Sequence, residues 1–564
     1  MNKKLTLALA ALTLSAATAS AQTIKVAKDY DVQITGSLQT DFLVPQEDNK
    51  IGTGTYDDKV LNNTYAEVHA LSKYVDAGVR LEYLDHPLPG FDKDFKGWGV
   101  PFYYIKGKLK NAELTLGNFY EQFGSGFILR TYEERSLGID NSLLGGRVMV
   151  RPFKGVQAKV IVGTQRRYWD TQSLIGGADL ELSVSEWSQK MQQSGTNLTL
   201  GASWVVNHQH QKEDVFADAT HKLRFVENTN AFDVRANFQK GGFSVLGEYA
   251  QKTEDPTFDG KFPYIYRKGY VTMLSTSYSQ SGMSILLQAK RSDNMNFRSC
   301  RTETSATAST INHLPAFAMQ QTYALASLYS YGTQPNGEWA YQAEFGYKFK
   351  RKTFLGGKYG TSFPHLPSKN KKIHDGGNPG TDGYGSPFWK QGDELYYQDI
   401  NVQLEKKITK DFKLNLMYMN QFYNKTVAEG HGGTIHSDIY IAEAKYRINK
   451  KLTLRGEAQY LHTDKDQGDW YFGLLELSIL PHFMFTISDQ YNGNEHYYTS
   501  LGAEDKSKGT HKEHYINGSV TFTHGAHRLQ VGYGKTRAGY NCSGGVCRYV
   551  PASKGVTVSY NYNF

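Results

Sequence analysis

Apolar and polar residues alternate along many segments of this chain, most clearly along the last one. Its apolar positions are Val556, Val558, Tyr560, Tyr562 and Phe564, and Thr, Ser and Asn fill the positions between them. Because successive side chains of a strand point to opposite faces, this segment predicts a strand with one apolar and one polar face.

A similar alternation recurs roughly a dozen times or more. It is clear at residues 32–42, 412–418, 440–448 and 452–460. In a water-soluble sandwich the polar face would point outward, whereas in a membrane barrel it faces a wet lumen. The charged residues that would then line the lumen include Arg455, Glu457, Glu443, Lys445 and Arg447. The final strand resembles the closing strand of outer-membrane barrels, in which the terminal aromatic residue, here Phe564, is recognised by the barrel-insertion machinery.

The connections between these segments differ greatly in length. Short turns at 110–111, 409–411, 449–451 and 525–526 contrast with long connections at 44–61, 86–99 and 363–393. This mixture is typical of the periplasmic turns and outer loops of a transmembrane barrel. A strand of about 12 residues, tilted by about 40°, rises about 30 Å, which matches a bilayer core. The chain therefore predicts a large transmembrane antiparallel β-barrel.

The segments number about 25, and bacterial single-chain barrels have an even number of strands. We therefore expect about 24 to 26 strands. The uncertain region is 314–363, where residues 332–337 fit either an inner or an outer turn.

The start of the chain predicts export. Lys3 and Lys4 precede an apolar run over 5–14 and the small residues Ala19-Ser20-Ala21, the pattern of a secretory signal peptide over residues 1–21. We expect residues 22–564 to form the barrel and the mature protein to lie in the outer membrane. Between Gln22 and a first strand near Asp31 there is no room for a separate plug domain.

Composition agrees with this class. The 39 Tyr, 29 Phe and 55 Gly favour strands joined by turns, and the mean hydropathy of −0.53 argues against helical membrane spans. The net charge of +8 is mild for 564 residues, and no nucleic-acid motif is visible. The aromatic residues could guide sugars along a channel, but interfacial girdles are the more common use of Tyr and Phe in barrels.

The segment 116–147 is the most unusual stretch, because charges of both signs lie in one connection among several Gly residues. Such a loop could fold into the lumen and form a constriction whose crossed charges orient polar solutes. Alternatively, the ions pair with one another or with arginines of the barrel wall, and hold the loop in place. The two interpretations are compatible. The candidate residues are Arg130, Glu133, Glu134, Arg135, Asp140, Arg147, Arg166 and Arg167.

This segment, followed later by Gly356-Gly357-Lys358-Tyr359-Gly360, resembles an uncharacterised porin-like outer-membrane β-barrel family of the Bacteroidota. The resemblance extends over nearly the whole mature chain. It implies the fold and an outer-membrane location in a Gram-negative cell, and it transfers no catalytic residue.

Three cysteines remain. Cys542 and Cys547 lie in the last long connection, where an exported chain favours a disulfide over a metal pair or two free thiols, and Cys300 would stay unpaired. The loop histidines His208, His210, His431 and His436 lack a third ligand at set spacing, so we expect no metal and no cofactor. No motif of a hydrolase, a phosphate loop or a zinc protease is present, so we expect no enzyme.

Three functions stay open. The leading hypothesis is a passive porin-like channel for small polar solutes. The second is a structural or accessory barrel with a closed lumen that serves a larger outer-membrane complex, and the third is a surface enzyme or adhesin that acts through its long loops. Balanced lumen charge would favour a closed interior, whereas an excess of one sign would favour a selective pore.

Overall fold

The computed structural model describes residues 22–27, 30–210, 214–216, 219–257, 264–302, 309–349, 361–366, 370–371, 379–494, 512–543 and 546–564. The predicted signal peptide over 1–21 and the segment Gly356–Gly360 lie outside the described residues.

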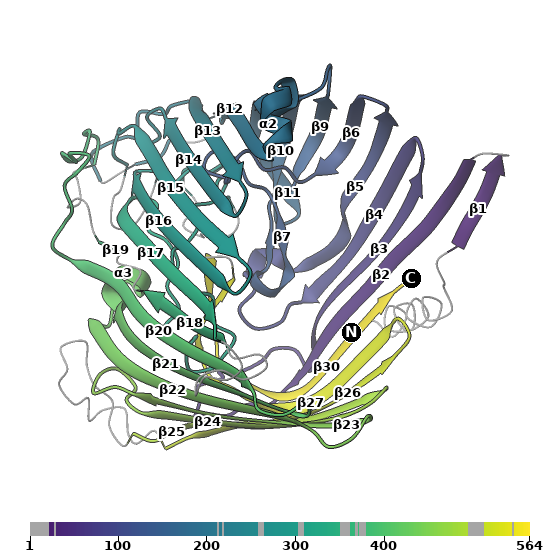
Figure 1. The fold of residues 1–564 in the computed structure, drawn as a ribbon, viewed down its shortest axis with the longest axis vertical. Coiled ribbons are helices and arrows are strands. Elements are labelled where there is room, and N and C mark those ends of the chain that lie inside the picture. The colour runs from purple at the N-terminus through teal and green to yellow at the C-terminus, as the bar shows by residue number, and fades with distance from the viewer. Residues whose placement is uncertain are drawn as a thin grey trace.

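The strands form one large antiparallel sheet that closes on itself as a barrel (Figure 1). The last strand pairs with β27 on one side and with β2 on the other, and β2 pairs with β3, so the ring is complete. Within the described residues the sheet contains 26 strands, of which β1 (Gln22–Ala27) pairs antiparallel with only the start of β2, outside the ring, and β19 (Asn370–Lys371) continues the line of β18. The wall therefore has 24 strands, an even number within the predicted range.

The wall strands have the following bounds: β2 (Tyr30–Pro45), β3 (Leu61–Ser72), β4 (Val75–His86), β5 (Gly97–Leu109), β6 (Ala112–Phe119), β9 (Leu143–Val150), β10 (Val156–Arg167), β11 (Asp170–Ser183), β12 (Thr196–His208), β13 (Asn228–Lys240), β14 (Phe243–Lys252), β15 (Gly269–Gln280), β16 (Met283–Asp293), β17 (Gly337–Lys348), β18 (Thr361–Leu366), β20 (Leu395–Lys407), β21 (Phe412–Asn424), β22 (Thr434–Arg447), β23 (Leu452–His462), β24 (Trp470–Ile479), β25 (Phe483–Asn492), β26 (His514–His524), β27 (His527–Thr536) and β30 (Ser553–Asn563).

The remaining elements are short and lie in connections. They are η1 (Lys93–Phe95), β7 (Glu133–Glu134), η2 (Arg135–Leu137), β8 (Ile139–Asp140), η3 (Val184–Trp187), α2 (Gln189–Gln193), α3 (Lys425–Glu429), β28 (Gly539–Ser543) and β29 (Val546–Val550). No helix in the described part of the chain is long and apolar enough to cross a membrane.

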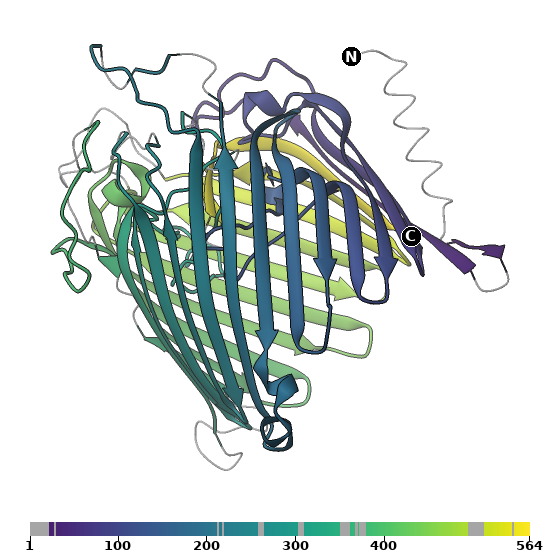
Figure 2. The same ribbon diagram turned by 90° about the horizontal axis from the view of Figure 1, so that it is seen from above.

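Most tight turns lie at one end of the barrel and the long connections at the other, as Figure 2 shows for the strands in front. Turns such as 110–111 and 525–526 lie at the first end. The start of β2 and the end of β30 lie at the same end. We call this the turn end and the other the loop end. Residues 332–336 end the long connection between β16 and β17, and Gly337 begins β17, so they lie at the loop end, which resolves the ambiguity left by the sequence.

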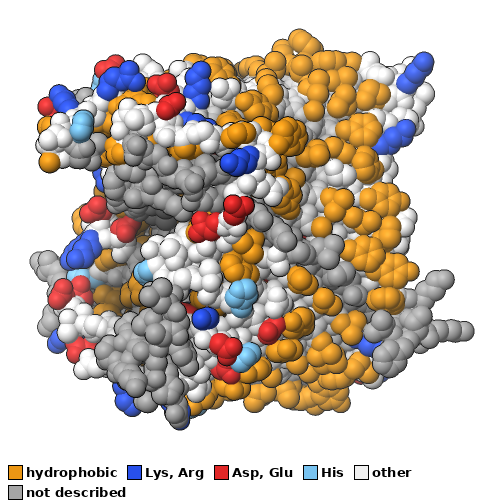
Figure 3. All heavy atoms as spheres, turned by 90° about the vertical axis from the view of Figure 1, so that its left-hand side faces the viewer, with side chains coloured by type: hydrophobic (Ala, Val, Ile, Leu, Met, Phe, Trp, Pro, Cys, Tyr) orange, Lys and Arg blue, Asp and Glu red, His pale blue; other side chains and the backbone are white. Residues whose placement is uncertain are grey.

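The outward side chains form an apolar surface, which covers much of the right half of the face in Figure 3, while charged side chains gather toward the left. Val160, Leu475 and Ile487 are each more than half exposed. Near the loop end, outward aromatic rings follow one another across neighbouring strands, with centroid distances of 4.3 to 6.3 Å. This row is formed by Tyr418, Tyr440, Tyr460, Tyr471, Tyr491 and His514. Its place and composition are those of an interfacial girdle.

The largest hydrophobic clusters lie inside the barrel. The connection between β6 and β9 and the connection between β16 and β17 fold inward, and their apolar side chains pack against inward residues of the wall. We call residues 120–142 the first inward loop and the described residues 294–302 and 309–336 the second inward loop. The two inward loops therefore occupy part of the lumen, and the first of them lies within the segment 116–147, which the sequence suggested could fold inward.

Candidate functional site in the barrel lumen

The first inward loop owes its shape to glycines and to a short apolar run. Gly124 and Gly126 have φ angles of +53° and +95°, a region that Gly adopts without strain, and they turn the chain back into the lumen. Phe127, Ile128 and Leu129 then follow, and each is 0% exposed. They pack with Ile311, Leu314 and Phe317 of the second inward loop and with Ile161, Ile175 and Val205 of the wall. Burial of this run holds the two loops together.

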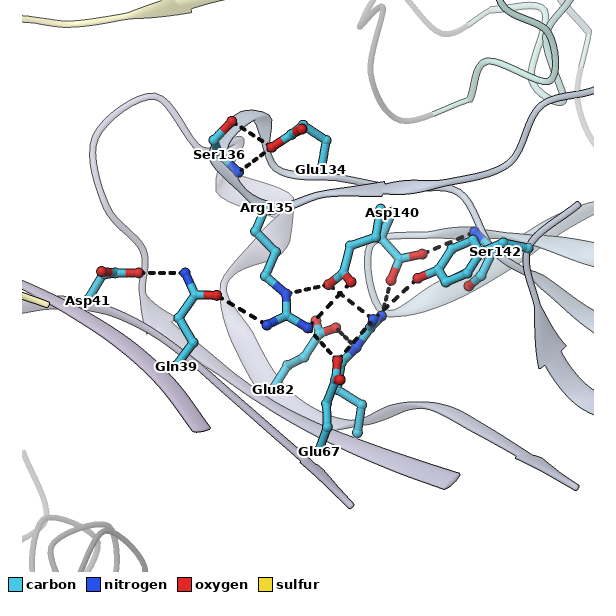
Figure 4. Close-up of polar contacts among 12 residues, drawn as sticks. Gln39, Asp41, Glu67, Glu82, Glu134, Arg135, Ser136, Asp140 and Ser142 are labelled. Carbon is cyan, nitrogen blue, oxygen red and sulfur yellow. Dashed lines mark hydrogen bonds and ion pairs between the residues drawn. The ribbon is translucent and has the colours of Figure 1, made fainter. Parts of the chain in front are cut away.

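Beyond the apolar run, the small hairpin of β7 and β8 carries the loop's charges to the wall strands β4 and β10 (Figure 4). Asp140 accepts a bond from Arg166 Nη1 at 2.6 Å and another from Arg80 Nη2. Glu82 contacts the same two arginines, at 2.8 Å from Arg80 Nε and 2.7 Å from Arg166 Nη2. Both guanidinium groups are only 3% exposed. We call these four residues the clasp.

Arg135 extends the clasp toward β2 and β3. Its Nε lies 2.6 Å from Glu133 Oε1, its Nη1 donates to Gln39 Oε1 at 3.2 Å, and its Nη2 contacts Glu67. Glu133 in turn lies 3.0 Å from Arg80 Nη1. Three arginines therefore contact four carboxylates in one connected network, so positive and negative charges nearly balance.

A second contact of this kind lies where the loop leaves β6. Glu121 is 2.5 Å from Arg147 Nε on β9 and 2.9 Å from Lys159 Nζ on β10. On the opposite side of the loop, the backbone N–H of Ser125 donates to Glu248 Oε1 on β14 at 2.8 Å. The loop is thus fixed to β4, β9 and β10 and, four strands beyond β10 around the ring, to β14.

The structure brings five of the eight candidate residues into these contacts. Glu133, Arg135, Asp140 and Arg166 join the clasp network, and Arg147 binds Glu121. The other three make different contacts. Arg130 lies over the ring of Tyr132, Arg167 lies over Tyr168, and Glu134 accepts from the Ser136 hydroxyl at 2.7 Å.

Sequence reasoning missed the wall residues Glu67, Arg80, Glu82 and Lys159, as well as Glu121 at the base of the loop. A signal was present, since Arg80 and Glu82 sit at alternate positions between apolar residues and therefore belong to an inward face. The pattern did not show which loop would meet that face.

Burial and the arginines have opposite effects on the acids of the hairpin. Burial alone would raise the pKa of Asp140, but the guanidinium groups of Arg166 and Arg80 hold it below its ordinary value of 3.8. For Glu133, burial has the larger effect and raises the pKa. Oxygen atoms of Glu82, Glu133 and Asp140 lie within 4.8 Å of one another, a spacing that suits a metal ion. Each of these carboxylates already contacts Arg80, so their charge is compensated by guanidinium groups rather than left for a cation.

The second inward loop is held by buried charges of its own. Asp255 lies 3.1 Å from Lys252 Nζ and 2.7 Å from Arg301 Nε, and all three side chains are 0% exposed. Further along the loop, Lys290 Nζ on β16 lies 2.9 Å from Glu338 on β17 and donates to the Pro315 carbonyl at 2.5 Å. The loop is therefore held at Arg301 through Asp255 and at Pro315 through Lys290.

A third connection, the hairpin of β28 and β29, lies against the first inward loop. The structure joins Cys542 and Cys547 in a disulfide across this hairpin. Ser543 donates to Glu134 at 3.3 Å, and Arg548 Nη2 donates to the Ser136 carbonyl at 3.0 Å. Cys300, in the second inward loop, carries a free thiol.

On the β22 and β23 wall, the charges predicted from the sequence lie on the inward face. Arg455 Nη1 lies 3.3 Å from Glu443 and 2.8 Å from Glu457. Lys445 and Arg447 follow toward the turn end, where both are exposed. The lumen is therefore accessible to water near the turn end, on the turn-end side of the inward loops.

The inner wall formed by β25, β26, β27, β30 and β2 differs from the rest. Most of its inward side chains are polar, and they include Thr486, Ser488, Asn517, Ser519, Arg528, Gln530, Thr557 and Ser559. Asn517, Arg528 and Thr557 are exposed. In the described part of the chain, neither lumenal hydrophobic cluster includes a residue of β25, β27, β30 or β2. We call this surface the polar wall.

Several solved structures are similar to this chain at a low level. The P pilus usher PapC translocation pore has a TM-score of 0.43 and 10% identity, with 94% of this chain and 99% of that chain covered. The siderophore receptor PirA from Pseudomonas aeruginosa has a TM-score of 0.40 and 9% identity, with 94% and 80% covered. For OccK8 (OprE) from Pseudomonas aeruginosa the values are 0.36 and 10%, with 77% and 95% covered.

These similarities are too low to carry an argument about function. No curated protein sequence matches the chain significantly. One family model does match, over residues 1–564, and the chain therefore belongs to a family of unknown function (DUF6029).

Proposed function

We propose that this protein is an outer-membrane channel for small polar solutes in a Gram-negative cell of the Bacteroidota, and that transport rather than catalysis is its role. The observation that carries this proposal is the polar wall, whose exposed inward side chains run from Asn517 near the loop end to Arg528 at the turn end. Hydroxyl and amide groups on such a surface replace part of the hydration shell of a passing solute.

The inward loops would make this channel narrow. They occupy much of the lumen beside β9 to β17 and β20 to β24 with packed apolar side chains. The solute path would then lie between the inward loops and the polar wall, and Arg135, which reaches Gln39 on β2, would border it. This arrangement favours a narrow channel over a wide and unselective pore.

Single-channel conductance in a planar bilayer tests the proposal. We expect stable but small conductance from the intact barrel, and a larger one after deletion of residues 121–141. Thr557→Trp places a bulky ring on the inward face of β30 and should lower the conductance severalfold. Its matched control is Val558→Trp, which changes the next, outward position of the same strand and should leave conductance unchanged. A silent intact protein would overturn the proposal, as would equal conductance of the two tryptophan variants.

A second candidate function is a closed accessory barrel of an outer-membrane complex. The clasp favours it, because three arginines and four carboxylates in one network suit a permanently ion-paired interior. Affinity purification of the tagged barrel from its native membrane, after mild solubilisation, addresses this candidate. A defined partner in constant ratio, together with no conductance, would support the accessory role over the channel.

A further inference from the structure

A small polar cavity lies between the second inward loop, the wall strands β20 and β21, and the start of the β28–β29 hairpin. Its volume is about 200 Å³, and its lining includes Gln321, Ser330, Tyr397, Arg537, Tyr540 and Asn541. At about 30 Å³ per water molecule, this space holds roughly seven waters, or a solute of similar size. None of the polar-wall side chains named above belongs to this lining.

Arg537 is the only charged residue among those that line the cavity. The structure gives its guanidinium group one hydrogen bond, from Nη1 to the carbonyl of the adjacent Ala538 at 3.0 Å. No carboxylate within the described residues forms an ion pair with it. In contrast, Arg80, Arg166 and Arg235 on the inner wall each contact at least two carboxylates.

The acids that lie nearest to Arg537 are already engaged elsewhere. Asp466 is 2.8 Å from Lys425 Nζ and accepts from the Tyr329 hydroxyl at 3.0 Å. Glu429 accepts from the Tyr423 hydroxyl at 3.0 Å and lies 3.9 Å from the same lysine. Burial lowers the pKa of Arg537, because no close carboxylate offsets the loss of water around it.

A second donor in the lining also has no partner. The side-chain nitrogen Nε2 of Gln321 is buried and makes no hydrogen bond in the structure. A buried donor without an acceptor is costly, and a half-buried cation without an anion loses hydration without compensation. The cavity thus combines a guanidinium group, an unused amide donor and no carboxylate, a set that is complementary to an oxyanion.

We propose that this cavity binds a small solute that carries a carboxylate or phosphate group, with Arg537 as its anchor and the Gln321 amide as a second donor. The guanidinium fork donates two parallel hydrogen bonds to such a group, and its charge compensates that of the ligand. Binding at this site goes beyond the proposed channel and does not require that the barrel conduct.

Isothermal titration of the purified full-length barrel, in a buffer without phosphate or carboxylate, tests this site. The probes are inorganic phosphate, succinate and, as a neutral solute, glycerol. We expect one of the two anions to bind and glycerol not to bind, and the anion that binds identifies the head group. Arg537→Gln should weaken binding on the order of tenfold to a hundredfold, because it removes charge-assisted hydrogen bonds.

The matched control is Lys445→Gln, which removes one positive charge from an exposed position on the inward face of β22 and should leave binding unchanged. Gln321→Leu keeps the charge of Arg537 and should weaken binding several-fold, so the test does not depend on the folding of one variant. No binding of either anion to the intact barrel would overturn the proposal, as would wild-type affinity in both cavity variants. Conductance of the same samples is measured separately, so failure of the channel and failure of the site are distinguishable.

Discussion

Replacement of Asp140 by alanine should release the first inward loop from the wall. Asp140 is the loop residue that contacts both Arg80 and Arg166, and its side chain is 7% exposed. Without it, Arg80 keeps Glu67, Glu82 and Glu133, and Arg166 keeps Glu82 as its one ion-pair partner among the described residues. The change therefore removes the central anion between two buried cations, while the apolar run at Phe127 stays in place.

The size of the effect follows from the burial of the pair. Loss of one partner of a buried ion pair costs about 3 to 5 kcal/mol, and the remaining contacts with Glu82 place Asp140→Ala near the lower end, at about 3 kcal/mol. At about 1.4 kcal/mol per factor of ten, the ratio of released to docked loop should rise roughly a hundredfold.

Limited trypsin digestion of the folded barrel measures this ratio, because Arg135 is a cleavage site within the loop. Cleavage after Arg135, identified by mass spectrometry, should be roughly a hundredfold faster in Asp140→Ala than in the unchanged protein. The control is Asp411→Ala, which breaks the exposed pair with Arg447 at the turn end and should change stability by less than about 1 kcal/mol. Equal cleavage rates in Asp140→Ala and the unchanged protein would refute the role of the clasp.

Three further predictions follow from the lumen. Phe127→Ala should lower the free energy of unfolding by about 3 to 5 kcal/mol, measured by denaturant titration, whereas Phe153→Ala at an exposed position should have little effect. Replacement of both Cys542 and Cys547 by serine should destabilise the β28–β29 hairpin by about 2 kcal/mol, the value expected for so short a closed loop, and unchanged hydrogen exchange over residues 539–550 would contradict this. Because Arg166 and Arg80 hold the pKa of Asp140 below 3.8, its contribution is present above that pH and is lost as the pH falls further. Trypsin-independent probes of loop release, such as a spin label on the loop, should show the loss of the Asp140 contribution below about pH 4.

Much of the fold could be predicted from the sequence because the alternation of side chains in a strand is a local property. The run from Val556 to Phe564 identifies its own apolar face whatever its neighbours are. The inward position of Glu443, Lys445 and Arg455 follows from the same rule. An even number of strands follows from antiparallel pairing around the whole ring, because an odd number would make the first and last strands parallel neighbours.

The inward loops were harder to predict, although the sequence contains a trace of them. Runs such as Val160-Ile161-Val162, Met417-Tyr418-Met419 and Ile439-Tyr440-Ile441 are apolar on both faces. In a barrel with a water-filled lumen, the inward side chains of each run would face water. Ile161, Met419 and Ile439 are instead buried against the inward loops. A strand segment that is apolar on both faces thus indicates cover on its inner side.

By itself, the sequence determined the class of fold, which side chains of a strand point inward and which charged residues face the lumen. Each of these depends on residues that are close together in the chain. The tertiary structure alone decided that two loops fill the lumen, that Asp140 meets Arg80 and Arg166, and that Arg537 has no carboxylate partner within the described residues. These features depend on contacts across tens to hundreds of residues, such as Arg135 with Gln39 and Ser125 with Glu248. The direction in which a loop folds is set by the sum of such distant contacts, which no local pattern records.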